Sequence, residues 1–544
     1  MNMKIKLIII SIAFSFIGFS CEEDFLDEEI RDRITADNLY STPSGFENGL
    51  NGLYALVRDE RRGSLGSTSR VSGVLWWSSV DNSYNPINIA EDFPYVRWGA
   101  FNNPAVDRYS EFWSYCYRVI NSANTIVNLA DSPDVIWDSE QQRDKVIGTA
   151  RLIRAWAYRH LIHLWGDVPL VLEVSGENIR TDWTRTPVSE ILDAMEADWL
   201  FAEEHLPEVH DEPGKVGRIV AQHYLAELYL MKEDYVKAEQ KAQAAVDNPN
   251  YSLVTSRYGV SADEPGVPFM DQFQNGNVMR SQGNTEALWV FVFDRFVSGG
   301  DRGNLMRRNW VPRYWALPGF ELNVENGGRG IGFLGITRFG LNLYEATDDR
   351  GSEFAIHRTI TAADGTQVPT TTDYSERIGN GVPSDGAADP NTQDPYWSNN
   401  WPGTKKWDDG EADIITSSYG YYDQPYLRLA ETYLLLAEAQ HMQNKNIEAA
   451  GNINVVRERS NATPITSGDV SIDFILDERS RELVAEEHRR YTLLRLDKWI
   501  ERTKLHNGYS GGYITDRDKL FPIPQDVIDA NISSEFPQNT GYNE

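Results

Sequence analysis

The chain has 544 residues, with 81 acidic and 51 basic side chains and a formal net charge of −30. This acidic balance argues against nucleic acid and anionic lipid head groups as partners, because both repel a negative surface. The length and a hydrophobic content of 41% allow an ample core. The 16 Trp, 26 Tyr and 21 Phe often fall in polar stretches with Gly, Asn and Pro. Such rings are typical of a binding surface, although they also anchor long loops to a core.

Residues 1–20 are predicted to be a signal peptide. Lys4 and Lys6 supply its positive start, and the apolar stretch after them is shorter than the roughly 20 residues of a membrane span. Gly18-Phe19-Ser20-Cys21 resembles the lipobox of bacterial lipoproteins, with Gly18 where Leu is usual. The resemblance implies a lipidated Cys21; the alternative is an ordinary signal peptide cleaved nearby. Cleavage leaves 49 basic and 81 acidic side chains, a mature charge of −32.

Apolar spacing predicts helices over 35–58, 109–130, 140–165 and 186–206. Asp37 or Ser41 is the expected cap of the first helix. The helix that runs up to Trp165 is the central one, because apolar residues cover most of its surface. Gly166 and Pro169 should end it, since glycine closes helices and proline cannot continue them.

Residues 217–249 are typical of a tetratricopeptide unit, in which small residues let two helices approach closely. Residues 426–457 are a second candidate unit. One such unit cannot bury its own faces, so others should stack on it. Helical periodicity fades over 250–420, where 287–293 is the best strand candidate. Loops this long that are rich in Trp are usually functional rather than disordered.

Several blocks resemble the SusD/RagB family of outer-membrane nutrient-binding lipoproteins. They are the Ala-Arg-x-x-Arg-Ala-x-Ala-Tyr pattern that leads to Trp-Gly-Asp-Val-Pro at 165–169, the helices at 426–439, 453–459 and 475–491, and the closing segments 521–524 and 538–542. Glu22-Glu23-Asp24 resembles the acidic export tag of surface lipoproteins. The blocks occur in the expected order, and 250–420 has few of them.

Patterns that suggest catalysis fail on context. Ser510 lies in a G-x-S-x-G match without the strand and helix of a nucleophile elbow. Residues 330–335 match G-x-G-x-x-G but follow no strand, which argues against a dinucleotide. The histidines have no metal-ligand spacing; His160 and His163 are expected to be structural. Cys116 is expected to be buried. The only other cysteine is Cys21, which lipidation would consume, so no disulfide is expected. We therefore expect no catalytic residue, no metal and no cofactor.

Two aromatic stretches are the candidate ligand site. A flat ring stacks on the apolar face of a sugar, while amide, carboxylate and guanidinium groups bind its hydroxyls. The predicted ligand-binding residues are Trp76, Trp77, Asp81, Asn82, Tyr84, Trp98, Arg308, Trp310, Tyr314 and Trp315. Trp397, Trp401 and Trp407 are further candidates. The alternative for each ring is that it anchors a loop on the helical core.

The expected fold is mainly α: a scaffold of tetratricopeptide-like helix pairs with a loop-rich side of minor β content. We expect one compact fold, with an N-terminal part over 21–250 and a C-terminal part over 251–544. The family resemblance implies a surface lipoprotein anchored in the outer membrane, which binds a nutrient oligomer and delivers it to a SusC-like TonB-dependent transporter. A glycan is the expected ligand. The alternatives are a peptide-binding member of the same family and a surface glycosidase or protease.

Overall fold

The computed structural model describes residues 39–62, 72–85, 94–174, 180–210, 212–297, 303–371, 399–408, 412–417 and 419–542. Cys21 and Trp397 lie outside these residues. None of the helices within these ranges is long and apolar enough to cross a membrane.

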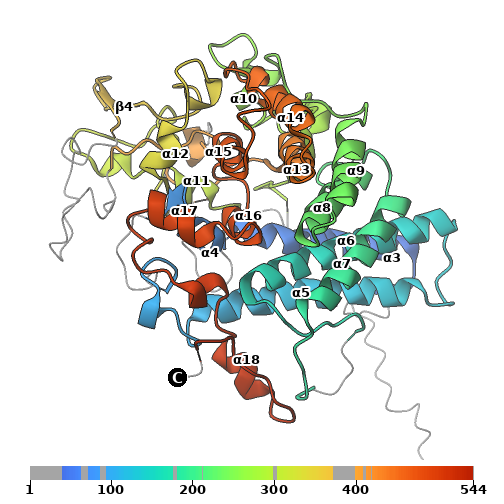
Figure 1. The fold of residues 1–544 in the computed structure, drawn as a ribbon. Helices are drawn as coiled ribbons and strands as arrows, with labels where there is room; N and C mark the ends of the chain where they lie inside the picture. Colours follow the sequence, from blue (N-terminus) through green and yellow to red (C-terminus); the bar gives the residue numbers. More distant parts are fainter. Residues whose placement is uncertain are drawn as a thin grey trace, which may run out of the picture.

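Helices packed as neighbours in chain order form an array on one side of the molecule (Figure 1). They are α3 (Pro43–Arg58), α5 (Asp107–Ala130), α6 (Glu140–Trp165), α7 (Val188–His205), α8 (Arg218–Met231) and α9 (Tyr235–Val246), and α13 (Leu429–Met442) and α14 (Asn446–Arg459) continue the array from α9. Both predicted tetratricopeptide-like pairs, α8 with α9 and α13 with α14, are present. The prediction of a divergent helical-pair scaffold is confirmed.

The central helix, α6, begins and ends as its sequence predicts. The Ser139 side chain accepts a hydrogen bond from the Gln142 amide and caps the first turn. Gly166 has φ 73°, a left-handed conformation that glycine adopts without strain, and its amide donates to the Ile162 carbonyl over 3.0 Å. Trp156 and Trp165 are both fully buried, so α6 packs on several sides rather than along one stripe.

Two predicted boundaries were wrong. The helix Pro43–Arg58 is capped by Thr42, whose hydroxyl accepts from the Gly45 amide, and not by Ser41; Asp37, the other predicted cap, lies outside the described residues. Pro43 then occupies its first turn, where a missing amide hydrogen costs nothing. Residues assigned to the start of the helix at 426–439 instead form β6 (Gln424–Arg428). This strand pairs antiparallel with β2 (Ala287–Phe291), the strand expected at 287–293, and pairing across distant segments overrides local helix propensity.

The loop-rich half lies opposite the array, with α11, α12 and β4 on the left of Figure 1. Its two other small sheets pair β1 (Ser83–Tyr84) with β3 (Gly335–Ile336) and β4 (Thr359–Thr361) with β5 (Gln367–Pro369). Its short helices are α4 (Val74–Trp77), α10 (Pro268–Asp271), α11 (Met306–Trp310) and α12 (Arg338–Asn342). The C-terminal helices are α15 (Ile472–Leu483), α16 (Arg489–Arg495), α17 (Trp499–His506) and α18 (Gln525–Ala530).

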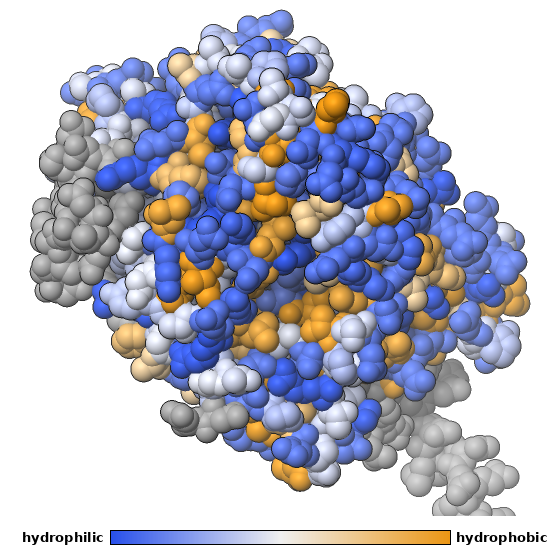
Figure 2. All heavy atoms as spheres, viewed as in Figure 1, coloured by the Kyte–Doolittle hydropathy of each residue, from blue (hydrophilic) through white to orange (hydrophobic). Residues whose placement is uncertain are grey.

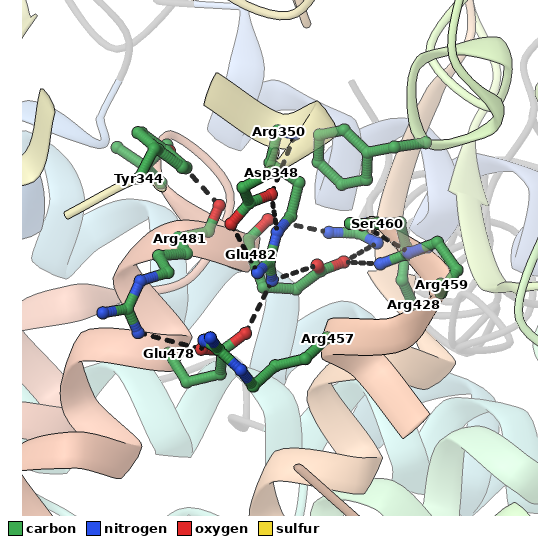
Figure 3. Close-up of polar contacts among 12 residues, drawn as sticks. Tyr344, Asp348, Arg350, Arg428, Arg457, Arg459, Ser460, Glu478, Arg481 and Glu482 are labelled. Atoms are coloured by element: carbon green, nitrogen blue, oxygen red, sulfur yellow. Dashed lines mark hydrogen bonds and ion pairs between the residues drawn. The ribbon is translucent and has the colours of Figure 1, made fainter. Parts of the chain in front are cut away.

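Buried ion pairs join the two halves (Figure 3). Glu482 on α15 accepts from Arg428 at 2.7 Å and from Arg350 at 3.1 Å, and it also pairs with Arg459. Glu286, beside β2, accepts from Arg428 at 2.6 Å and from Arg459 at 2.8 Å. We call Glu286, Arg350, Arg428, Arg459 and Glu482 the central ion-pair network. Each of these side chains is at most 1% exposed.

The arginines determine the charge state of this network. Burial raises the pKa of Glu482, but Arg459, Arg428 and Arg350 outweigh burial and hold that pKa well below its usual range. Removing one partner of a buried pair leaves the other partner charged without compensation.

We expect Glu482→Gln to lower the free energy of unfolding by about 3–5 kcal/mol, because three buried guanidinium groups lose their shared carboxylate. Urea unfolding followed by circular dichroism measures the change. Glu501→Gln is the matched control: Glu501 pairs with Lys498 at 3.0 Å, is 63% exposed, and should change stability by less than about 1 kcal/mol. Equal effects of the two substitutions would contradict a structural role for the network.

Candidate ligand-binding site

The two predicted aromatic stretches meet in the core of the protein. Trp76 and Trp77 are the last two residues of the four-residue helix α4 and are 0% and 1% exposed. The Trp77 ring packs edge-on against Trp310 of α11, with ring centroids 5.5 Å apart, and its Nε1 donates to the Glu487 carbonyl over 2.7 Å. The structure thus brings together segments separated by more than 200 residues, but it does so through buried packing.

Asp81 belongs to a buried ion pair. Its carboxylate accepts from Arg489 over 2.8 and 2.7 Å and from Arg502 over 2.7 Å, and its exposure is 0%. Burial raises the pKa of Asp81, but the two arginines outweigh it and lower that pKa from 3.8 to about 2. The acid that sequence reasoning assigned to ligand hydroxyls is therefore already saturated by two guanidinium groups.

The neighbouring candidates are also internal. Asn82 donates to the Ser480 hydroxyl over 3.1 Å, and the Tyr84 ring packs edge-on against Trp401. Trp98 stacks on Phe521 with centroids 5.6 Å apart, and its Nε1 donates to the Ser79 hydroxyl. Trp98 has φ 47°, a left-handed backbone that is uncommon for a bulky side chain and is held here by this packing.

Eight of the ten predicted ligand contacts therefore have no face open to a ligand in this structure. They are Trp76, Trp77, Asp81, Asn82, Tyr84, Trp98, Trp310 and Tyr314, each at most 2% exposed. Trp401 and Trp407 are buried as well. For these rings the alternative reading, loop anchors on a core, is the one that the structure supports, because their hydrogen-bonding edges bind backbone or their faces pack on other rings. Arg308 and Trp315 remain partly exposed.

Trp315 is the best-formed aromatic surface among the predicted residues. It lies in a short helical turn, η7 (Tyr314–Ala316), and its Nε1 donates to the Gly330 carbonyl over 2.8 Å, which fixes the ring. The Cζ atom of Arg313 lies 4.6 Å from the ring centroid and that of Arg329 lies 5.9 Å away. The ring packs at the edge of an apolar cluster formed by Val311, Tyr314, Leu317 and Ile360, with Phe320 beside it.

The loop after this turn continues the surface. Arg308 places its guanidinium 5.7 Å from the Phe333 ring, and its carbonyl accepts from the Ile331 amide over 2.9 Å. We call Arg308, Arg313, Trp315, Phe320, Arg329 and Phe333 the Trp315 platform. Sequence reasoning included only two of these six residues. A usable signal was the Gly-rich run 327–335, which it considered only as a nucleotide-binding pattern.

Backbone contacts hold the platform in place. A Cβ atom on Gly330 would lie 2.0 Å from the Val311 carbonyl oxygen, so only glycine allows this close approach. The Tyr314 hydroxyl donates to the Asn323 carbonyl and accepts from the Asn323 amide, both over 3.1 Å. Burial raises the pKa of Tyr314 to about 12, so the hydroxyl keeps its proton. These contacts fix the backbone on both sides of Trp315 and so give its partly exposed ring a fixed orientation.

One buried cluster has the donor atoms of a metal site. Nε2 of His160 and Nε2 of His488 lie 3.7 and 3.6 Å from the Glu60 carboxylate. A contact behind His488 argues against a metal, however. Arg159 donates to Nδ1 of His488, which keeps the imidazole proton on Nε2, the atom that would have to bind the metal. Burial, the largest cause, lowers the pKa of both histidines well below 6.5. Both imidazoles are therefore neutral, and the three residues fit a polar part of the core.

An apolar groove lies on the helical side. It has a volume of about 800 Å³ and runs between α5, the extended residues 169–171 and α18. Its walls are largely apolar, with Trp113, Tyr117, Val527 and Phe536 among them, and Trp183 and Arg180 form its edge. The Arg180 guanidinium stacks 4.1 Å from the Trp183 ring.

Two family profiles match the chain. One, described as "SusD family", matches residues 341–542, and the other, described as "Starch-binding associating with outer membrane", matches residues 24–230. The chain belongs to the SusD family. A SusD-like protein of Formosa agariphila is 26% identical over 91% of this chain and 90% of its own length. A SusD-like protein of Bacteroides ovatus is 22% identical over 94% of this chain and 87% of its own.

Solved structures share the SusD fold. A SusD homologue from Bacteroides thetaiotaomicron has a TM-score of 0.72 at 18% identity and covers 94% of this chain and 99% of its own. A protein titled "Laminarin binding SusD-like protein" has a TM-score of 0.67 at 20% identity, covering 91% and 99%. "Surface glycan-binding protein A" from Bacteroides uniformis scores 0.67 at 19% identity, covering 91% and 98%. The titles of the last two structures name binding to laminarin or to glycans.

We expect Asp81→Asn to lower the free energy of unfolding by roughly 3–5 kcal/mol at pH 7, because Arg489 and Arg502 lose their shared carboxylate. The folded pKa of Asp81, about 2, lies below its ordinary 3.8, so its stabilisation is present above pH 4 and is lost as pH falls from 4 to 2. The difference in free energy of unfolding between the wild type and Asp81→Asn, measured with urea, should therefore decrease as the pH falls from 4 to 2.

Asp516→Asn serves as the control, since Asp516 is 89% exposed and pairs with Lys519 on the surface. If Asp81→Asn kept its stability but lost ligand binding, Asp81 would be a ligand contact and its assignment to the core would be wrong.

Proposed function

We propose that this SusD-family protein is a surface lipoprotein of the outer membrane that binds an oligo- or polysaccharide and passes it to a SusC-like TonB-dependent transporter. No bond is broken. The observation that carries the proposal is the Trp315 platform, a fixed and partly exposed indole flanked by guanidinium groups. A rigid ring covers the apolar face of a pyranose at low entropic cost, and guanidinium groups donate to its oxygens.

The relatives support this choice of ligand class. One matching profile is described as starch-binding, and two solved neighbours are titled as laminarin-binding and glycan-binding. The proposed anchor is lipidated Cys21, and the proposed contact surface for the transporter is the helical array. Both rest on the family resemblance and on the sequence around Cys21.

We expect Trp315→Ala to weaken glycan binding at least tenfold, equivalent to about 1.4 kcal/mol, with little loss of stability because the ring is partly exposed. Isothermal titration calorimetry against a panel of laminarin, starch and other polysaccharide fragments measures the affinity. Trp183→Ala is the matched control, a partly exposed tryptophan on the other side of the protein. A glycan that binds the two variants and the wild type equally would place the site elsewhere.

The 800 Å³ groove favours a second candidate, capture of peptides, because its walls are mostly apolar and its edge carries Arg180 and Asp526. Apolar walls with a few polar groups suit peptide side chains. The same two variants separate the candidates: a peptide ligand in the groove loses affinity with Trp183→Ala and not with Trp315→Ala. Release of new reducing ends from a glycan by the purified protein would instead indicate a glycosidase.

A further inference from the structure

We propose that the glycan taken by the Trp315 platform carries negative charge, as uronate carboxylates or sulfate esters. This inference rests on the proposed function and names its substrate class. Residues 303–340, which contain the whole platform, hold five arginines, no lysine and only two acids, Glu321 and Glu325. The whole chain has a net charge of −30, whereas this segment, with five arginines and two acids, has a net charge of +3.

Two of the five arginines lie over the Trp315 ring, and a third lies in contact with the loop that follows it. Arg313 and Arg329 both approach Trp315, and Arg308 lies over Phe333 in the same loop. Two guanidinium groups thus lie beside the partly exposed Trp315 ring, and a third lies over the buried Phe333 ring of the loop that carries Arg329. Arg307 serves the fold instead: it is fully buried, and its Nη2 donates to the carbonyls of Ser417 and Tyr419.

Arg329 differs from the arginines of the core. In the central ion-pair network each guanidinium faces two or three carboxylates within 3.1 Å or less. Among the described residues, Arg329 donates to the Thr416 carbonyl over 3.1 Å and forms no ion pair with a carboxylate. The chain has 81 acids, yet none of those described neutralises this partly exposed cation. An anionic ligand is the partner that its charge suits.

The residue type adds chemical detail. The guanidinium fork matches the two oxygens of a carboxylate or sulfate and binds them with two parallel hydrogen bonds, whereas lysine offers a point charge. A sugar that contacts the exposed part of Trp315 comes close to Arg313 and Arg329, whose Cζ atoms lie 4.6 and 5.9 Å from the ring centroid. A uronate or sulfate there gains charge-assisted hydrogen bonds that a neutral hydroxymethyl group does not. The mature charge of −32 makes such local cations necessary, because the surface as a whole repels a polyanion.

Matched ligand pairs test the inference by calorimetry on the full mature protein. One pair is oligogalacturonate and its methyl-esterified form, and the other is fucoidan before and after desulfation; each pair shares a backbone and differs in charge. We expect the charged member of at least one pair to bind at least tenfold more tightly. Its affinity should fall several-fold between 50 and 500 mM NaCl, because salt screens partly exposed charges.

Arg329→Gln should remove most of the preference for the charged member, and Arg329→Lys should restore only part of it. The control is Arg143→Gln, which alters a partly exposed arginine on α6 that pairs with Asp144. It should leave the preference for the charged ligand unchanged. Thermal unfolding shows whether the Arg329→Gln variant is folded. If that variant is not folded, Arg313→Gln replaces it in the same measurement.

Equal affinity for both members of each pair, with binding retained in Arg329→Gln and Arg313→Gln, would overturn the charge inference and leave the glycan function standing. Failure of the wild type to bind any charged or neutral glycan, including the laminarin and starch fragments, would overturn the proposed function and this inference together.

Discussion

Buried pairing between carboxylates and guanidinium groups is the interaction on which the arrangement of the two halves depends. In the central ion-pair network, Arg428 of β6 pairs with Glu482 of the C-terminal helix α15 (Figure 3). Arg428 also pairs with Glu286 beside β2. Two further pairs hold α6: Arg154 with Asp198 on α7, and Arg159 with Glu227 on α8. Such pairs add little net stability relative to an apolar core, but an unpaired member is costly. They therefore exclude alternative packings in which one partner loses the other, and they fix how the loops sit on the helices.

This constraint also decides where a ligand can be held. Asp81 pairs with Arg489 of α16 and Arg502 of α17, and Trp77 of α4 donates to the Glu487 carbonyl. These contacts attach the loop-rich half to the C-terminal helices. The Trp315 ring is partly exposed, and the loop beside it is held where Gly330 approaches the Val311 carbonyl. Figure 2 shows a face that is mainly hydrophilic, with apolar side chains in separate patches. A small, rigid aromatic site fits such a surface better than one broad apolar area.

The helical half could be predicted closely because its signals are local. Apolar spacing, Ser139 and Gly166 define α6 within a few neighbouring residues, and the small residues of 217–249 specify close helix packing. Strand β6 was missed because its pairing partner, β2, lies more than 130 residues earlier in the chain. The ligand site was located only in part: the stretch around Trp315 was found, but Arg329 and Phe333 approach it through a turn of the Gly-rich loop that no periodicity reveals.

The sequence by itself determined the α-rich scaffold, the family and the acidic surface, because helix periodicity, caps and charge are properties of neighbouring residues and of composition. Only the tertiary structure decided which aromatic and acidic residues are available to a ligand. Trp310 and Trp315 are five residues apart and chemically identical, yet one is buried against Trp77 and the other is partly exposed beside Arg313. Burial depends on which distant segments pack on a ring, and the ring's own neighbours in sequence do not encode it.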